Sequence, residues 1–127
     1  NFKNVVVNAT TLDEYVAANN IQEIDLLKLD TEGTENVILH GASGVIDRMK
    51  PIIICETLFD TIEPDLQFTL ASFGYEFYNH VPGGLKKVES IVRVKDDGVR
   101  NCFFVHPTKR HLIDEFIVFE QADLAVA

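Results

Sequence analysis

The sequence lacks any apolar run long enough to cross a membrane, and no signal-peptide pattern precedes its first strand-like segment. These two absences argue against a membrane-spanning or exported protein, so the sequence predicts a cytoplasmic location. Only two cysteines are present, and both Cys55 and Cys102 lie inside strand-like runs. Cysteines in such runs are typical of buried thiols that behave as small apolar side chains. A disulfide framework is not expected.

Positive charge is also scarce. The 127 residues include 11 Lys and Arg against 20 Asp and Glu, which gives a net charge of −9. Nucleic acids and anionic membranes are bound through Lys and Arg, so neither is expected as a main partner, and the substrate is not expected to be a polyanion. The length fits one small domain over residues 1–127.

A glycine-rich nucleotide-binding turn is missing as well. Such a turn follows a strand and opens a helix, so that backbone N–H groups face the ligand. The pairs Gly41 and Gly44, and Gly83 and Gly84, do not lie in that setting. The sequence therefore assigns no cofactor-binding residues.

What the sequence does contain is a buried strand that ends in acid. The segment 24–29 is almost continuously apolar, as expected of a parallel strand covered on both faces. Asp30, Glu32 and Glu35 follow it, and Gly33 allows the backbone to turn sharply toward a helix. In open α/β sheets, ligands bind beyond the carboxyl ends of the strands. This turn is therefore the candidate site, although Glu35 has a simpler explanation in the favourable interaction of an acid with a helix N-terminus.

A helical stretch of suitable length for a crossover follows the acidic turn. It leads to a second apolar strand, 52–55, which ends at Glu56. Two strands joined in this way run parallel, so their acidic ends meet at one edge of the sheet. Asp30, Glu32 and Glu56 are therefore the candidate catalytic residues. Carboxylates held close together need compensation. Three forms are open: pairing with Lys28, a bound Mg²⁺, or a raised pKa that creates a general base.

The same segment carries a family resemblance. A signature of the form K-[IL]-D-x-E-G-x-E followed by VL and GA is matched by Lys28, Asp30, Glu32, Gly33, Glu35, Val37, Leu39, Gly41 and Ala42. Upstream, Thr11-Leu12-Asp13 resembles a "TLDD" helix start, and downstream the segment 50–56 resembles a "P-x-I-x-x-E" strand. In order and spacing, these blocks resemble the FkbM family of S-adenosylmethionine-dependent methyltransferases.

The resemblance implies an α/β fold, a Rossmann-like (class I methyltransferase) half-domain whose mixed, mostly parallel sheet is flanked by helices. It implies S-adenosylmethionine as cofactor and O-methylation of a small-molecule acceptor. Because the glycine-rich turn is missing, the chain resembles the carboxyl-terminal half of that fold. We expect it to bind the cofactor poorly by itself and to self-associate through an apolar sheet edge, as a homo-oligomer. A non-catalytic remnant or interaction module remains an alternative, and a signalling-receiver module is a weaker one.

The remaining segments predict further elements. A strand is expected in 1–8, and a helix is expected after a capping box at Thr11 and Glu14. Apolar spacing in 38–49 predicts a helix that Gly41 and Gly44 can divide into two. Further predictions are a helix over 62–73, a strand over 75–81, a hairpin arm or lid in 85–100, a strand over 102–105 and a helical tail from Lys109. In the sheet we expect the strands near 24, 52, 102 and 75 in that spatial order, with the 102 strand antiparallel.

Overall fold

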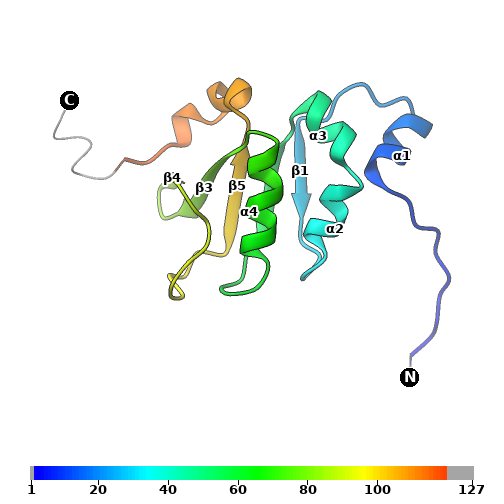
Figure 1. Ribbon diagram of the computed structural model, residues 1–127, viewed down its shortest axis with the longest axis horizontal. Coiled ribbons are helices and arrows are strands. Elements are labelled where there is room, and N and C mark those ends of the chain that lie inside the picture. The colour runs from blue at the N-terminus through cyan, green and yellow to red at the C-terminus, as the bar shows by residue number, and fades with distance from the viewer. Residues whose placement is uncertain (1, 120–127) are drawn as a thin grey trace.

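The computed structural model describes residues 2–119, which form one mixed α/β unit (Figure 1). The strands are β1 (Leu26–Leu29), β2 (Ile52–Glu56), β3 (Glu76–Val81), β4 (Gly84–Val88) and β5 (Asn101–Val105). The helices are α1 (Leu12–Ala18), α2 (Glu35–His40), α3 (Ser43–Met49) and α4 (Glu63–Ser72), followed by the 3-10 helices η1 (Pro107–Leu112) and η2 (Asp114–Phe116). The long stretch 38–49 is therefore two helices, because the chain turns at Gly41 and Ala42 between them.

Within the described residues, the strands form one sheet in the order β1-β2-β5-β3-β4. This confirms the predicted spatial order, and β5 runs antiparallel to β2 as expected. The prediction of a mostly parallel sheet is wrong. Only β1 and β2 pair in parallel, whereas β5 lies antiparallel between β2 and β3, and β3 and β4 form an antiparallel hairpin. Insertion of one returning strand between two others makes two antiparallel pairs at once.

The main core lies between the sheet and the helices α2, α3 and α4, which cover one face (Figure 1). Its fully buried side chains come from alternate strand positions and from one stripe of each helix, namely Ile53, Cys55, Phe104, Leu39, Ile46, Leu66 and Leu70. Full burial of one such large apolar side chain stabilises the fold by about 1.5–3 kcal/mol. Both cysteines are buried and free, as their strand positions predicted.

Helix α1 is attached to α3 through Asp13. Its carboxylate accepts hydrogen bonds from the backbone N–H groups of Gly44 and Val45, each at 2.9 Å, and so caps the N-terminus of α3. The predicted N-cap of α1 is confirmed, since Thr11 Oγ1 accepts a bond from the Glu14 N–H at 3.1 Å. The Thr-Leu-Asp block therefore starts α1 and joins it to α3.

Two predictions about the ends of the chain are wrong. Residues 2–8 form no strand, because no neighbouring strand pairs with them, and Val6 is 96% exposed; Asn1 lies outside the described residues. The described part of the tail, 109–119, is not an α-helix with one apolar face, and 120–127 lie outside the described residues. It forms the end of η1 and then η2; Ile113 between them packs under the sheet beside Tyr78, while Phe116 is exposed. The prediction of a hairpin arm holds for β4, and 89–100 continues as a loop.

Candidate active site

The parallel pairing of β1 with β2 brings the candidate acids together. The register aligns Leu29 with Cys55, so Asp30 and Glu56, the next residues along each strand, lie side by side. Together with Glu32 they line a pocket of about 270 Å³ at the carboxyl ends of these strands. Leu58 and Ile62 from the β2–α4 loop contribute an apolar side to the same pocket. The three predicted acids therefore share one concave surface.

Crowding in this pocket raises the pKa of Glu56. The largest cause is a hydrogen bond between its side chain and that of Asp30, followed by repulsion from the Asp30 charge, partial burial and the charge of Glu32. Only Arg100 acts in the opposite direction among these causes. Carboxylates crowded in this way favour the protonated form of Glu56. The pocket therefore contains a carboxyl group of raised pKa within reach of a bound molecule.

The turn that carries Asp30 and Glu32 is fixed by Glu35. Glu35 is 1% exposed, and its carboxylate accepts hydrogen bonds from the N–H of Thr31 at 3.1 Å and from the N–H of Gly33 at 2.9 Å. The turn also holds Glu32 in the left-handed region, at a φ of 56°. A residue other than glycine adopts this conformation at a cost, so surrounding contacts must enforce it. Glu35 supplies these contacts from the first residue of α2.

The opposite wall is held by a buried ion pair. Glu63, at the start of α4, accepts a bond from the Thr61 N–H at 2.8 Å and pairs with Arg93 at 3.1 Å. The side chains of Glu63 and Arg93 are 2% and 7% exposed. The Thr61 hydroxyl donates to the Leu58 carbonyl at 2.7 Å, which closes the loop on itself. The pocket wall is therefore fixed at both ends.

Two other forms of compensation find no support in the described residues. Lys28 is exposed on β1, and no ion pair joins it to Asp30 in the part of the chain that the structure describes. Over the same residues, no group of three or more His, Cys, Asp and Glu side chains is arranged to hold a metal ion. The remaining form of compensation is a raised pKa of Glu56, which the crowding by Asp30 and Glu32 causes.

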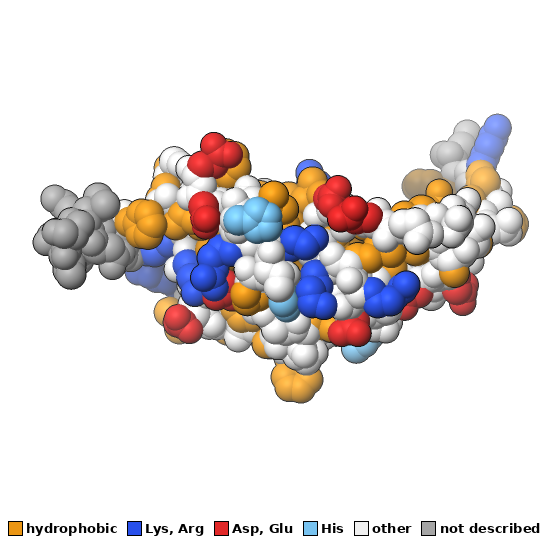
Figure 2. All heavy atoms as spheres, turned by 90° about the horizontal axis from the view of Figure 1, so that it is seen from above, with side chains coloured by type: hydrophobic (Ala, Val, Ile, Leu, Met, Phe, Trp, Pro, Cys, Tyr) orange, Lys and Arg blue, Asp and Glu red, His pale blue; other side chains and the backbone are white. Residues whose placement is uncertain are grey.

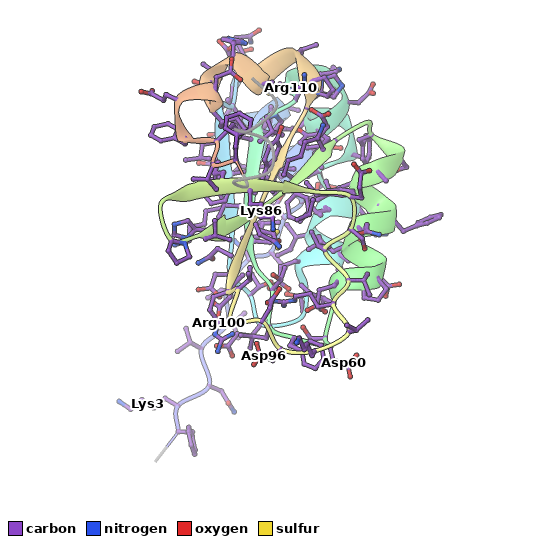
Figure 3. All side chains as sticks on the ribbon, turned by 90° about the vertical axis from the view of Figure 1, so that its left-hand side faces the viewer. Lys3, Asp60, Lys86, Asp96, Arg100 and Arg110 are labelled. Carbon is purple, nitrogen blue, oxygen red and sulfur yellow. The ribbon has the colours of Figure 1, made fainter. Side chains whose placement is uncertain are left out.

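Charge is distributed unevenly along the strands. Figure 3 shows Asp60 and Asp96 beside Arg100 at the end of the molecule where β1 and β2 finish, and Arg110 at the other end. Figure 2 views that other end, where Lys and Arg side chains gather over the surface. Lys50 ends α3 there, and Lys109 and Arg110 lie on η1. The acidic pocket therefore opens away from most of this positive charge.

Sequence reasoning did not find three residues that shape this site. Glu35 was explained by the helix N-terminus, Glu63 was not singled out, and Arg93 lay in the stretch of ambiguous pattern. The spacing of Glu35 two residues after Gly33, and of Glu63 two residues after Thr61, is a usable signal, because a carboxylate at that spacing can accept a bond from the earlier N–H. No local pattern identifies Arg93, whose partners lie 30 and 36 residues away.

Comparison with known proteins gives a family. The family model of the methyltransferase FkbM domain matches residues 1–78, which include β1, β2 and the acids that end them. This chain belongs to the FkbM methyltransferase family. No curated protein and no solved structure matched the chain. In the described part of this FkbM chain, no helix is both long enough and apolar enough to cross a membrane.

FkbM methyltransferases use S-adenosylmethionine, so we tested whether the glycines form a cradle for it. Three of them do not, because a contact within the fold fills the space beside each one. A Cβ atom at Gly41 would lie 3.0 Å from the methyl group of Thr11, and one at Gly44 would lie 3.0 Å from the carboxylate of Asp13. At Gly84 it would strike the carbonyl oxygen of Phe116. These three glycines serve helix docking and the tail, whereas the space beside Gly33 in the acidic pocket and beside Gly98 is open.

Proposed function

We propose that this chain forms the acceptor-side part of an S-adenosylmethionine-dependent O-methyltransferase that acts on a small-molecule hydroxyl. The observation that supports the proposal is the pairing of Asp30 with Glu56 at the carboxyl ends of two parallel strands in an FkbM chain. In this proposal, residues 1–127 are one domain that corresponds to the carboxyl-terminal part of a Rossmann-like methyltransferase fold. The cofactor-binding residues are not assigned to this chain.

The chemistry that the pocket can perform follows from its protonation. A hydroxyl is a weak nucleophile, and a carboxylate that takes its proton during the reaction accelerates attack by about 10²- to 10⁴-fold. A carboxyl group of raised pKa is a stronger base than an ordinary one, which suits Glu56 to this role. Asp30 would keep the pKa of Glu56 raised, and Glu32 would accept hydrogen bonds from further hydroxyls of the acceptor. Leu58 and Ile62 would contact its apolar parts.

Charge restricts the acceptor. Four carboxylates, those of Asp30, Glu32, Glu35 and Glu56, line the pocket, and the chain carries a net charge of −9, so a polyanionic acceptor would be repelled. Neutral, polyhydroxylated molecules fit better, because their hydroxyl groups donate to carboxylate oxygens. We therefore propose a sugar or polyketide hydroxyl as the acceptor, and neither a nucleic acid nor a membrane as a partner.

The test is a methyl-transfer assay on the product of the complete coding sequence. The protein is incubated with methyl-labelled S-adenosylmethionine and matched panels of hydroxyl, amine and thiol acceptors, and the products are identified by mass spectrometry. Methyl ethers are the expected products. Transfer only to nitrogen or sulfur would contradict O-methylation, and absence of transfer from every panel would favour the second candidate.

That second candidate is a non-catalytic remnant or interaction module of the methyltransferase fold. It is favoured by one observation, the occupation of Gly41, Gly44 and Gly84 by internal contacts. Calorimetric titration of residues 1–127 with S-adenosylmethionine tests the shared expectation that this chain alone binds the cofactor weakly. Micromolar affinity would overturn that expectation, and with it the assignment to one half of the fold.

Self-association is a separate part of the proposal. Strand β1 is an outer strand of the sheet, and Leu26 on it is 56% exposed. An outer strand with unpaired backbone groups and an apolar side chain favours pairing with another chain. Sedimentation velocity should show a homo-oligomer that dissociates in Leu26→Lys, and a monomer at all concentrations would contradict this.

A further inference from the structure

Arg93 occupies an unusual position for a residue of a long loop. Its side chain is 7% exposed, although it belongs to the segment 89–100 between β4 and β5. One terminal nitrogen, Nη1, donates to Asp97 Oδ1 at 2.8 Å and to the Val99 carbonyl at 2.7 Å, within the same loop. The other nitrogen, Nη2, leaves the loop and reaches the wall of the acidic pocket.

Nη2 holds both ends of the β2–α4 loop. It donates to the carbonyl of Thr57 at 2.8 Å and to Glu63 Oε1 at 3.1 Å. Thr57 directly follows Glu56, and Glu63 is the first residue of α4. The loop between them contributes Leu58, Thr61 and Ile62 to the pocket lining. Figure 3 shows Asp60 of this loop and Asp96 of the Arg93 loop at the same end of the molecule.

Burial of the Arg93–Glu63 ion pair costs free energy. This cost indicates that the pair serves to fix the geometry of the loop more than to stabilise the fold. A buried ion pair loses the hydration of both charges, and apolar residues of similar volume are often as stable. Among the described residues, the Nε atom of Arg93 is also buried without a hydrogen-bond partner. The planar guanidinium of Arg93 can bind all four acceptors at once. Its Nη2 donates to the Thr57 carbonyl and to Glu63, and its Nη1 donates to Asp97 and to the Val99 carbonyl.

We propose that Arg93 is the positioning residue of the acidic pocket, which holds Glu56 against Asp30 by tying Thr57 to Glu63. Arg93 does not touch the acceptor in this proposal. It acts through the backbone that immediately follows Glu56. The inference rests on the proposed function, because it gives a purpose to the pocket that Asp30 and Glu56 form.

The proposal predicts that loss of Arg93 lowers the pKa of Glu56, which is the opposite of what the loss of a positive charge alone would do. The ionisable groups that act on Glu56 are Asp30, Glu32 and Arg100. Removing a nearby cation raises the pKa of a carboxyl group, because the anion loses a favourable interaction. If Arg93 instead positions Glu56, its loss separates Glu56 from Asp30, and the pKa of Glu56 falls toward the ordinary value.

The experiment is an NMR titration of the glutamate side-chain carboxyl carbons in residues 1–127. We expect the midpoint of Glu56 to fall in both Arg93→Met and Arg93→Lys, since lysine keeps the charge but not the fork. Arg100→Met is the electrostatic control and should raise the midpoint. Arg110→Met, which loses its pair with Glu76 at the other end, should leave it unchanged. A rise in Arg93→Met, or no change in Arg93→Lys, would overturn the proposal.

If the Arg93 variants do not fold, native-state hydrogen exchange on the unaltered chain tests whether Arg93 ties the loop into one unit. The amides of Thr57 and Thr61 donate to the Arg100 carbonyl and to Glu63, so a loop tied by one guanidinium should open both with one common free energy. Independent opening of the two amides would overturn the proposal. Failure of the methyl-transfer assay would leave these results unchanged, and failure here would leave the role of Asp30 and Glu56 untouched.

Discussion

Two pairs of carboxylates lie at the same end of this sheet and are treated in opposite ways. Glu35 and Glu63 are each 1% exposed, and hydrogen-bond donors or a guanidinium surround both. Asp30 and Glu56 line the open pocket at the ends of neighbouring strands, and the Asp30 side chain raises the pKa of Glu56. The first pair holds the turns on either side, and the second pair is left under mutual repulsion. Residues kept in an unfavourable arrangement by a well-satisfied surrounding structure are those expected to perform chemistry.

The largest effect that tests this comparison is on turnover. In the product of the complete coding sequence, Asp30→Asn should slow methyl transfer by about 10²- to 10⁴-fold, because the carboxylate that raises the pKa of the proposed base Glu56 is lost. The melting temperature should stay the same or rise, since one of several crowded negative charges is removed. Glu56→Gln should behave alike. Rate measurements and calorimetry together check this, and variants that are destabilised by several kcal/mol yet turn over normally would reverse the two roles.

The next effect is on stability and concerns Glu63. Glu63→Ala should lower the free energy of unfolding by about 3 kcal/mol, because the buried charge of Arg93 loses a partner. Urea unfolding followed by circular dichroism measures the change. Glu76→Ala is the matched control, as its pairs with Lys87 and Arg110 are partly exposed and should contribute less. Equal losses in both variants would show that burial does not distinguish these acids.

Glu35→Gln should give a smaller loss, about 2 kcal/mol, since an amide has one acceptor oxygen where the carboxylate has two for the N–H groups of Thr31 and Gly33. Glu32→Gln, in the same turn but exposed, is the control and should leave stability nearly unchanged. If Glu35→Gln were neutral, the turn would not depend on this carboxylate, and the contrast with Asp30 would weaken.

The smallest effect is on the pH dependence of stability. The pKa of Glu56 is higher in the folded chain than its ordinary value of 4.5, so folding takes up a proton and stability falls as pH rises through the folded pKa. Glu56→Gln should remove this fall. Asp96 has the opposite sign, because the Gly98 N–H lowers its pKa, and its contribution is lost as pH falls. Unfolding curves from pH 3 to 8 for wild type, Glu56→Gln and Asp96→Asn check both signs.

Local pattern predicted much of the site. Consecutive residues contain the apolar runs of β1 and β2, the acids that end them and the crossover between them. The parallel direction of the two strands then follows from this connection. The convergence of Asp30, Glu32 and Glu56 was predicted on this basis, and the structure brings them into one pocket. Their catalytic role and the acceptor stay predictions. The prediction of an α-helix in the tail was wrong. Its apolar spacing fits 3-10 turns as well as an α-helix, and local pattern does not include the packing of Ile113 under the sheet.

The sequence by itself determined where acid follows a buried strand, because alternation and turn chemistry act over a few residues. Only the tertiary structure decided which acids are compensated. Glu35 and Glu63 are the same residue type as Glu32 and Glu56. They differ because folding places donors around them from the acidic turn, from the β2–α4 loop and from the distant Arg93. The cost of burying a charge depends on all groups within a few ångströms, and sequence separation does not limit which groups these are.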